Sequence, residues 1–237
     1  MNLKHTSKDI FGLAVENFYN SADLTPISVH LQGFDDDEIP VDYLFRNYSE
    51  MPILEKKALD LCKGNVLDVG CCAGSHSLEL KKRNLEVFPI DISKKCINIC
   101  QKLGLANAKH GDFYELIPKQ YDTILMLMNG IGIAKSIKHL PVFFEKLKQL
   151  MHQESQVLLD SSDLIYLYDK APEPGSSESY YGEMVFQTSY KGERSEPFPW
   201  LFLDYKLLRS EAKQHGLDCQ LIYKDEHYGF LAQLRLS

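Results

Sequence analysis

The fold of this 237-residue chain is decided by the stretch Val66-Leu67-Asp68-Val69-Gly70-Cys71-Cys72-Ala73-Gly74-Ser75-His76. The pattern predicts a buried strand that enters a glycine-rich turn and then a helix, with Ser75 as the N-cap. Such a turn lets backbone N–H groups approach a ligand closely, and a helix N-terminus adds partial positive charge. A dinucleotide-binding turn has the spacing Gly-x-Gly-x-x-Gly, whereas Gly70, Cys72 and Gly74 are two apart.

Around this stretch, short aliphatic runs alternate with amphipathic segments, which predicts a parallel sheet with crossover helices. The expected strands are Asn65–Val69, Glu86–Asp91, Ala108–Gly111, Tyr121–Met128 and Gln156–Asp160. Ser93 is the predicted N-cap of a helix that stops at Gly104, and a further helix covers 136–151. A helix at Asp204–His215, a strand at Leu217–Tyr223 and a last alternating strand near 230–236 predict a closing antiparallel hairpin.

The flanks of this pattern predict additions to a single domain over residues 1–237. Two helical stretches, Asp9–Asn20 and Tyr43–Cys62, surround an acidic loop at Asp35–Glu38, so residues 1–62 are expected to form an N-terminal helical cap. Residues 165–202, rich in Pro and Tyr, are expected to form an insertion or lid after the fifth strand. We expect the cap and the lid to cover an acceptor site together.

Composition and charge limit the classes of partner that the chain can be expected to bind. The chain has 26 Lys and Arg against 33 Asp and Glu, a net charge of −7, which argues against bulk nucleic-acid binding. No apolar run is long enough to span a membrane, and the first nine residues lack a secretory signal pattern. The six cysteines show no metal-ligand spacing, so no metal site is expected and free thiols in a cytoplasmic protein are the interpretation.

The turn, together with the acid Asp91 that ends the next strand, resembles the first motifs of the class I S-adenosylmethionine-dependent methyltransferases. The resemblance covers about residues 60–165 by motif, and the closing hairpin matches the family's ending. It implies a three-layer Rossmann-like fold with a seven-stranded, mostly parallel sheet and an antiparallel last strand. Cys72 departs from the family pattern, in which glycine is usual. A Cβ at this position needs negative φ or extra room.

The resemblance also implies the roles of the cofactor-binding residues. Asp68 and the turn Gly70, Cys71, Cys72 and Gly74 would hold the methionine end of the donor. Asp91 would bind the ribose and Ile92 one face of the adenine. Asp112 and Phe113 would lie at the adenine edge, and Met128 would border the site at the end of the fourth strand.

The acceptor and the catalytic residues stay open. Asn129, Asp163 and His76 are weak candidates, set against ordinary turn, capping and helix-end roles. The expected function is methyl transfer from S-adenosylmethionine to a small-molecule acceptor, leaving S-adenosylhomocysteine, by a monomer or homodimer. Methylation of a protein or RNA, a non-catalytic cofactor-binding regulatory module, an aminopropyl transferase and a nucleotide-dependent oxidoreductase are the alternatives.

Overall fold

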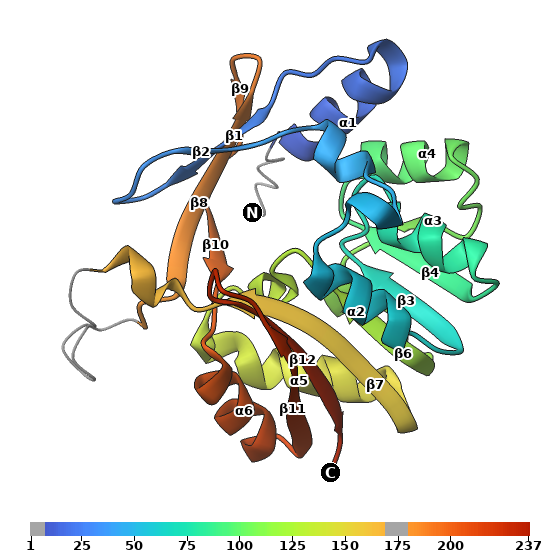
Figure 1. Ribbon diagram of the computed structural model, residues 1–237, viewed down its shortest axis with the longest axis vertical. Helices are drawn as coiled ribbons and strands as arrows, with labels where there is room; N and C mark the ends of the chain where they lie inside the picture. Colours follow the sequence, from blue (N-terminus) through green and yellow to red (C-terminus); the bar gives the residue numbers. More distant parts are fainter. Residues whose placement is uncertain (1–7, 169–179) are drawn as a thin grey trace, which may run out of the picture.

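The computed structural model describes residues 8–168 and 180–237. Its centre is a seven-stranded sheet with the order β11-β12-β7-β6-β3-β4-β5 (Figure 1). The strands are β3 (Asn65–Val69), β4 (Glu86–Asp91), β5 (Lys109–His110), β6 (Tyr121–Met126), β7 (Met151–Ser162), β11 (Leu217–Lys224) and β12 (Gly229–Leu236). β3 pairs in parallel with both β4 and β6, and β12 runs antiparallel to β7 and β11. The predicted seven-stranded Rossmann-like sheet is therefore confirmed.

Helices cover both faces of this sheet. The bounds are α1 (Ile10–Ser21), α2 (Ile53–Leu61), α3 (Ser75–Lys82), α4 (Lys94–Lys102), α5 (Leu140–Gln149) and α6 (Tyr205–Gln214). Apolar residues of α5 and α6 pack on one face, and those of α2 and α3 pack on the other. Adjacent strand residues alternate between these two cores, as Val66 and Leu67 do, because side chains of a strand point to opposite faces. Among the described residues no helix combines the length and apolarity needed to cross a bilayer.

A second, antiparallel sheet stands apart from the first in Figure 1. Its main order is β10-β8-β1-β2, with β9 paired to β8. The strands are β1 (Ile27–Leu31), β2 (Asp37–Ile39), β8 (Glu183–Tyr190), β9 (Glu193–Arg194) and β10 (Phe198–Leu201). Because β1 pairs with β8, the N-terminal segment and the insertion meet through backbone hydrogen bonds. Part of the predicted lid, 169–179, lies outside the described residues.

Several local predictions needed correction. The N-terminal segment is not purely helical, because β1 and β2 follow α1, and β2 includes residues of the predicted acidic loop. The helix expected over 43–62 is broken into 3₁₀ turns at Asp42–Phe45 and Tyr48–Glu50 before α2 begins after Pro52. Proline fixes the extended backbone of its predecessor, which prevents a continuous helix.

Smaller differences concern element ends. β6 ends at Met126, two residues before the predicted end, because Met128 adopts a left-handed conformation. β7 begins earlier than predicted, and β5 is shorter. A 3₁₀ turn at Ile137–His139 replaces the first turn of the predicted helix over 136–151. Ser75 is the first residue of α3 rather than its cap, since its hydroxyl donates to Leu44 O at 2.6 Å. Ser93 is a true N-cap, accepting from Cys96 N at 3.0 Å.

Candidate functional site

The turn between β3 and α3 is open toward solvent at its first glycine. Gly70 has φ +74°, and a Cβ added there would meet no heavy atom within 4 Å. Gly74 has φ +84°, and its N–H donates to Cys71 O at 2.7 Å. Left-handed backbone favours glycine at both positions. The turn therefore keeps a backbone cradle that a side chain at position 70 would fill.

Cys72 shows how the turn accommodates a side chain where the resembling family has glycine. Its φ is +48°, so the residue is left-handed, and it packs in the apolar cluster between α1 and α4. A left-handed non-glycine residue costs about 1–2 kcal/mol. Two hydrogen bonds stabilise the Cys72 backbone in this conformation. Cys72 N donates to Asp91 Oδ2 at 2.9 Å, and the Cys100 thiol donates to Cys72 O at 3.2 Å.

Asp91 joins this turn to the next one. Its second oxygen, Oδ1, accepts from Ser93 N at 2.7 Å, so each carboxylate oxygen has one backbone donor. Burial raises the pKa of Asp91, and the two N–H donors oppose that rise. A carboxylate held in this way keeps free lone pairs for further donors such as hydroxyl groups.

Asp68 lies at the end of β3 beneath the turn. It is 3% exposed and accepts from the Ser77 hydroxyl, with Oδ2 at 2.5 Å from Oγ. Burial raises its pKa.

A small pocket brings together residues of the turn, of the N-terminal segment and of the end of β6. Its lining is Leu44, Arg46, Asp68, Gly70, Cys71, Cys72, Ser75, His76, Leu127 and Met128.

His76 lies at the N-terminal end of α3, as the sequence favoured, but it is buried against Glu55 and not solvated. It is 8% exposed, and its Nε2 lies 2.9 Å from Glu55 Oε2. Glu55 also accepts from Arg46, with Nη2 at 2.6 Å from both carboxylate oxygens. Hydrogen bonds and charge from His76 and Arg46 lower the pKa of Glu55, although burial opposes them. Sequence reasoning missed Glu55. The signal that could have found it is the position of an acidic residue on the apolar face of α2, beside Leu54 and Ala58.

The residues expected beside the adenine differ in their exposure to solvent. Ile92 is 74% exposed beside Asp91, so its side chain is available to a ligand. Asp112 caps a 3₁₀ turn (Phe113–Glu115), accepting from Tyr114 N at 2.8 Å. Phe113 is 3% exposed, and its ring packs 5.8 Å from that of Phe143 in the main core. Its backbone, and not its ring, is the part left for an adenine contact.

The loop after β6 is held by a carboxylate of β7. Met128 and Asn129 have φ +63° and +62°, both left-handed. Asp160 stabilises this conformation, accepting from Met128 N at 3.1 Å and from Gly130 N at 2.8 Å. Burial raises the pKa of Asp160 to about 7. Sequence reasoning placed Asp160 at the end of the fifth strand and assigned it no role.

Two of the weak catalytic candidates have structural contacts. Asn129 Nδ2 donates to Leu201 O at 2.9 Å, whereas Asn129 Oδ1 is the one buried side-chain oxygen or nitrogen without a partner in the described ranges. Asp163 caps a 3₁₀ turn (Leu164–Leu167) by accepting from Ile165 N at 3.0 Å, and it also accepts from the Tyr181 hydroxyl at 2.7 Å. Asp163 therefore has the capping role that the sequence favoured for it.

The second sheet contacts the site through β10. A Cβ added to Gly132, in the 3₁₀ turn Gly130–Ala134, would lie 2.1 Å from Trp200 Cε2, so the indole ring lies directly against this glycine. The neighbouring Leu201 carbonyl is the acceptor for Asn129. Strand β10 therefore borders the same loop that carries Met128 of the pocket.

Comparisons with known proteins agree with this architecture. A family model described as a methyltransferase domain matches residues 66–154. The structure of an S-adenosylmethionine-dependent methyltransferase from Bacteroides fragilis, in complex with S-adenosylhomocysteine, is 38% identical. It covers 97% of this chain and 95% of its own, with a TM-score of 0.90. No curated protein matches the sequence.

More distant structures share the fold alone. The CcbJ methyltransferase from Streptomyces caelestis is 14% identical over 80% of this chain and 94% of its own, with a TM-score of 0.59. An amino pentose methyltransferase from Micromonospora echinaspora, solved with bound S-adenosylmethionine, is 11% identical over 80% of this chain and 94% of its own, with a TM-score of 0.57.

Proposed function

The chain belongs to the S-adenosylmethionine-dependent methyltransferases, and from that premise we propose that its methyl acceptor is a small molecule. The enzyme takes S-adenosylmethionine as its cofactor. When bound, that cofactor supplies a methyl group already activated by a sulfonium, so the protein's main task is to hold the acceptor in line and exclude water.

We assign the donor site to the residues around the open turn. The backbone of Gly70, Cys71, Cys72 and Gly74 would face the methionine end, with Asp68 fixing the turn from below. Asp91 has lone pairs to spare beside the turn and would accept from both ribose hydroxyls. Exposed Ile92 would cover one adenine face, and Asp112 with the Phe113 backbone would meet its edge. Met128, 37% exposed, would border the donor from the β6 loop.

The observation that carries the small-molecule proposal is the contact between Trp200 and Gly132. It brings the second sheet against the loop beside the donor pocket, and we place the acceptor between this sheet and the carboxyl edge of the first one. A ligand enclosed on both sides suits a small molecule better than a flat macromolecular surface. We therefore propose that the N-terminal segment and residues 180–202 of the insertion together form the acceptor site.

The test uses S-adenosylmethionine labelled in its methyl group. A cell extract is separated into metabolite, RNA and protein fractions, and each is incubated with the enzyme. We expect the label in the metabolite fraction alone. Label confined to RNA or protein would identify a macromolecular acceptor. Calorimetric binding of S-adenosylhomocysteine without transfer to any fraction would favour a regulatory module.

A further inference from the structure

One face of the second sheet is apolar and only partly covered. The strand register aligns Phe186 with both Leu31 and Phe198, and Met184 with Trp200, so these side chains share a face. At one end of this face, Ile27 and Tyr190 are buried against α1. At the other end, Leu31, Phe186, Phe198 and Trp200 stay half-buried. We call these four residues the aromatic wall.

The aromatic wall adjoins the proposed acceptor entrance. Trp200 lies against Gly132, and the ring of Phe198 lies edge-on to that of Trp200 with centroids 6.1 Å apart. Phe186 continues the wall, 6.3 Å from Phe198. Rings that are packed against each other keep fixed faces, and a fixed aromatic face attracts a cation through its quadrupole.

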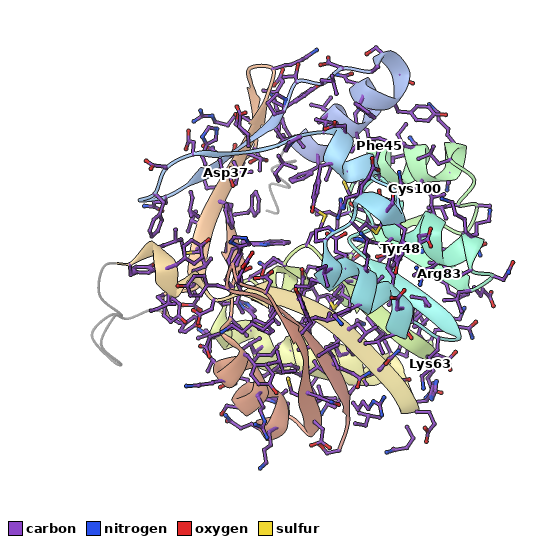
Figure 2. All side chains as sticks on the ribbon, viewed as in Figure 1. Asp37, Phe45, Tyr48, Lys63, Arg83 and Cys100 are labelled. Carbon is purple, nitrogen blue, oxygen red and sulfur yellow. The ribbon has the colours of Figure 1, made fainter. Side chains whose placement is uncertain are left out.

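The strands contribute two acidic side chains and no basic one to this face among the described residues. Asp37 pairs with Val29 and so points to the same side as Leu31, and Figure 2 shows Asp37 on the β2 strand of this sheet. Glu193, opposite Tyr190, is the second charged residue of the face among the described strands, and it is paired with Lys8, so Asp37 is the acid that remains for a ligand. The basic side chains nearby are engaged elsewhere, because Lys191 pairs with Asp23 and Arg194 bonds to Gln187, whose register places it on the opposite face.

We propose that the aromatic wall and Asp37 bind the acceptor as an amine carrying an apolar body. This inference rests on the proposed function and names its substrate class. A cation gains from the ring faces and from the field of Asp37 on the same face of the sheet, whereas an anion would be repelled by that field. The bound ammonium releases a proton to water. The nitrogen lone pair then forms the N–C bond as the C–S bond of the donor breaks, with the electron pair remaining on sulfur.

The single tryptophan of the chain, Trp200, provides the readout. The protein is saturated with S-adenosylhomocysteine and titrated, with tryptophan emission recorded, with 2-phenylethylamine, 2-phenylethanol and 3-phenylpropionate, which share a ring and differ in charge. We expect the amine to bind about ten-fold more tightly than the other two. Equal or tighter binding of the alcohol or the propionate overturns the proposal, as does an absence of any amine response up to roughly 10 mM.

Two neighbouring acids give a matched pair of variants. Asp37→Asn should weaken amine binding about three- to five-fold and leave the alcohol unchanged. Glu38→Gln, whose pairing with Ser28 places it on the opposite face, should change neither. Equal effects of the two variants would mean that only general charge matters and would overturn the role of Asp37. Calorimetry with S-adenosylhomocysteine and thermal melting confirm that each variant is folded.

Failure of this inference can be distinguished from failure of the proposed function. In the labelled-donor experiment, a methylated carboxylate, hydroxyl or carbon in the metabolite fraction would overturn the amine proposal while a small-molecule acceptor stands. Label in RNA or protein alone would overturn the proposed function itself.

Discussion

The donor turn and the second sheet are built in opposite ways. The turn between β3 and α3 is formed by consecutive residues, and the main long-range tie to it, from Asp91, comes from the very next strand. The second sheet joins β1 near the N-terminus to β8 in the insertion, more than 150 residues later. The turn can be predicted from a local sequence pattern. The second sheet forms only when strands that are distant in the sequence pair in the folded chain.

This difference separates two tasks of the enzyme. The turn that we propose as the donor site lies within the family-model match at 66–154. The wall that we propose for the acceptor is assembled from two segments outside that match, the N-terminal segment and the insertion. Changes in the turn should therefore alter cofactor binding, and changes in the second sheet should alter acceptor use alone.

The largest expected effect is on the donor side. Asp91→Ala should weaken S-adenosylhomocysteine binding by at least about 100-fold, because two ribose hydroxyls lose a charged acceptor worth roughly 1.5–3 kcal/mol per hydrogen bond. The change also frees Cys72 N and Ser93 N. Calorimetry measures the affinity, and Asp218→Ala on the exposed edge strand is the control. Unchanged affinity in a folded Asp91→Ala variant would leave Asp91 with a purely structural role.

The next effect concerns the loop where the two regions meet. The pKa of Asp160 rises on folding from 3.8 to about 7, so the folded state holds a proton that the unfolded state loses between these values. The stability from this group is complete below pH 4 and is lost as the pH rises through 7, by at most about 4 kcal/mol. Glu55 raises and His76 lowers this pKa by their charges.

Denaturant unfolding from pH 4 to pH 8 tests the Asp160 prediction. In Asp160→Asn this contribution to the slope should be missing, so the stability of the variant relative to wild type should rise with pH. A constant difference between wild type and Asp160→Asn across this range would show that Asp160 does not titrate there.

A smaller effect is expected at the contact between the loop and the second sheet. Gly132→Ala inserts a Cβ into the Trp200 ring and should destabilise the fold by about 1–3 kcal/mol through overpacking. We expect methyl transfer to be lost and S-adenosylhomocysteine binding to be kept. Gly111→Ala, where the added Cβ meets no atom within 4 Å, should leave the free energy of unfolding unchanged. Loss of donor binding in Gly132→Ala would contradict the separation of the two regions.

The smallest effect tests the strain in the turn. Cys72→Gly relieves a left-handed φ, which should stabilise the protein by up to about 1 kcal/mol, less the packing lost with the thiol. Cys62→Gly is the matched control, because Cys62 has φ −62° and a glycine there should destabilise. Equal destabilisation by both changes would show that Cys72 carries no backbone strain.

Prediction from sequence succeeded where one local pattern sufficed. The alternation of strands and helices predicted a parallel sheet with crossover helices, and the family resemblance implied seven strands; the structure has both. The cap at Ser93 and the helix stop before Gly104 followed from single residues. The prediction was wrong at Ser75, whose hydroxyl does not cap the helix. That hydroxyl donates a hydrogen bond to the carbonyl of Leu44 in the N-terminal segment. Sequence reasoning placed His76 correctly at a helix end but missed its burial, because the partner Glu55 lies one helix earlier in the chain.

The sequence by itself determined the turn that we propose as the donor site, because the turn, its glycines and the acid Asp91 are set by residues within two consecutive strand–turn units. Only the tertiary structure decided the proposed acceptor side. Isolated strands such as β1 and β2 carry weak local signals and are specified by their partners, and the partner of β1 lies in the insertion. The aromatic wall, the buried Arg46–Glu55–His76 network and the clamp at Asp160 all depend on such distant pairings, which no spacing along the chain records.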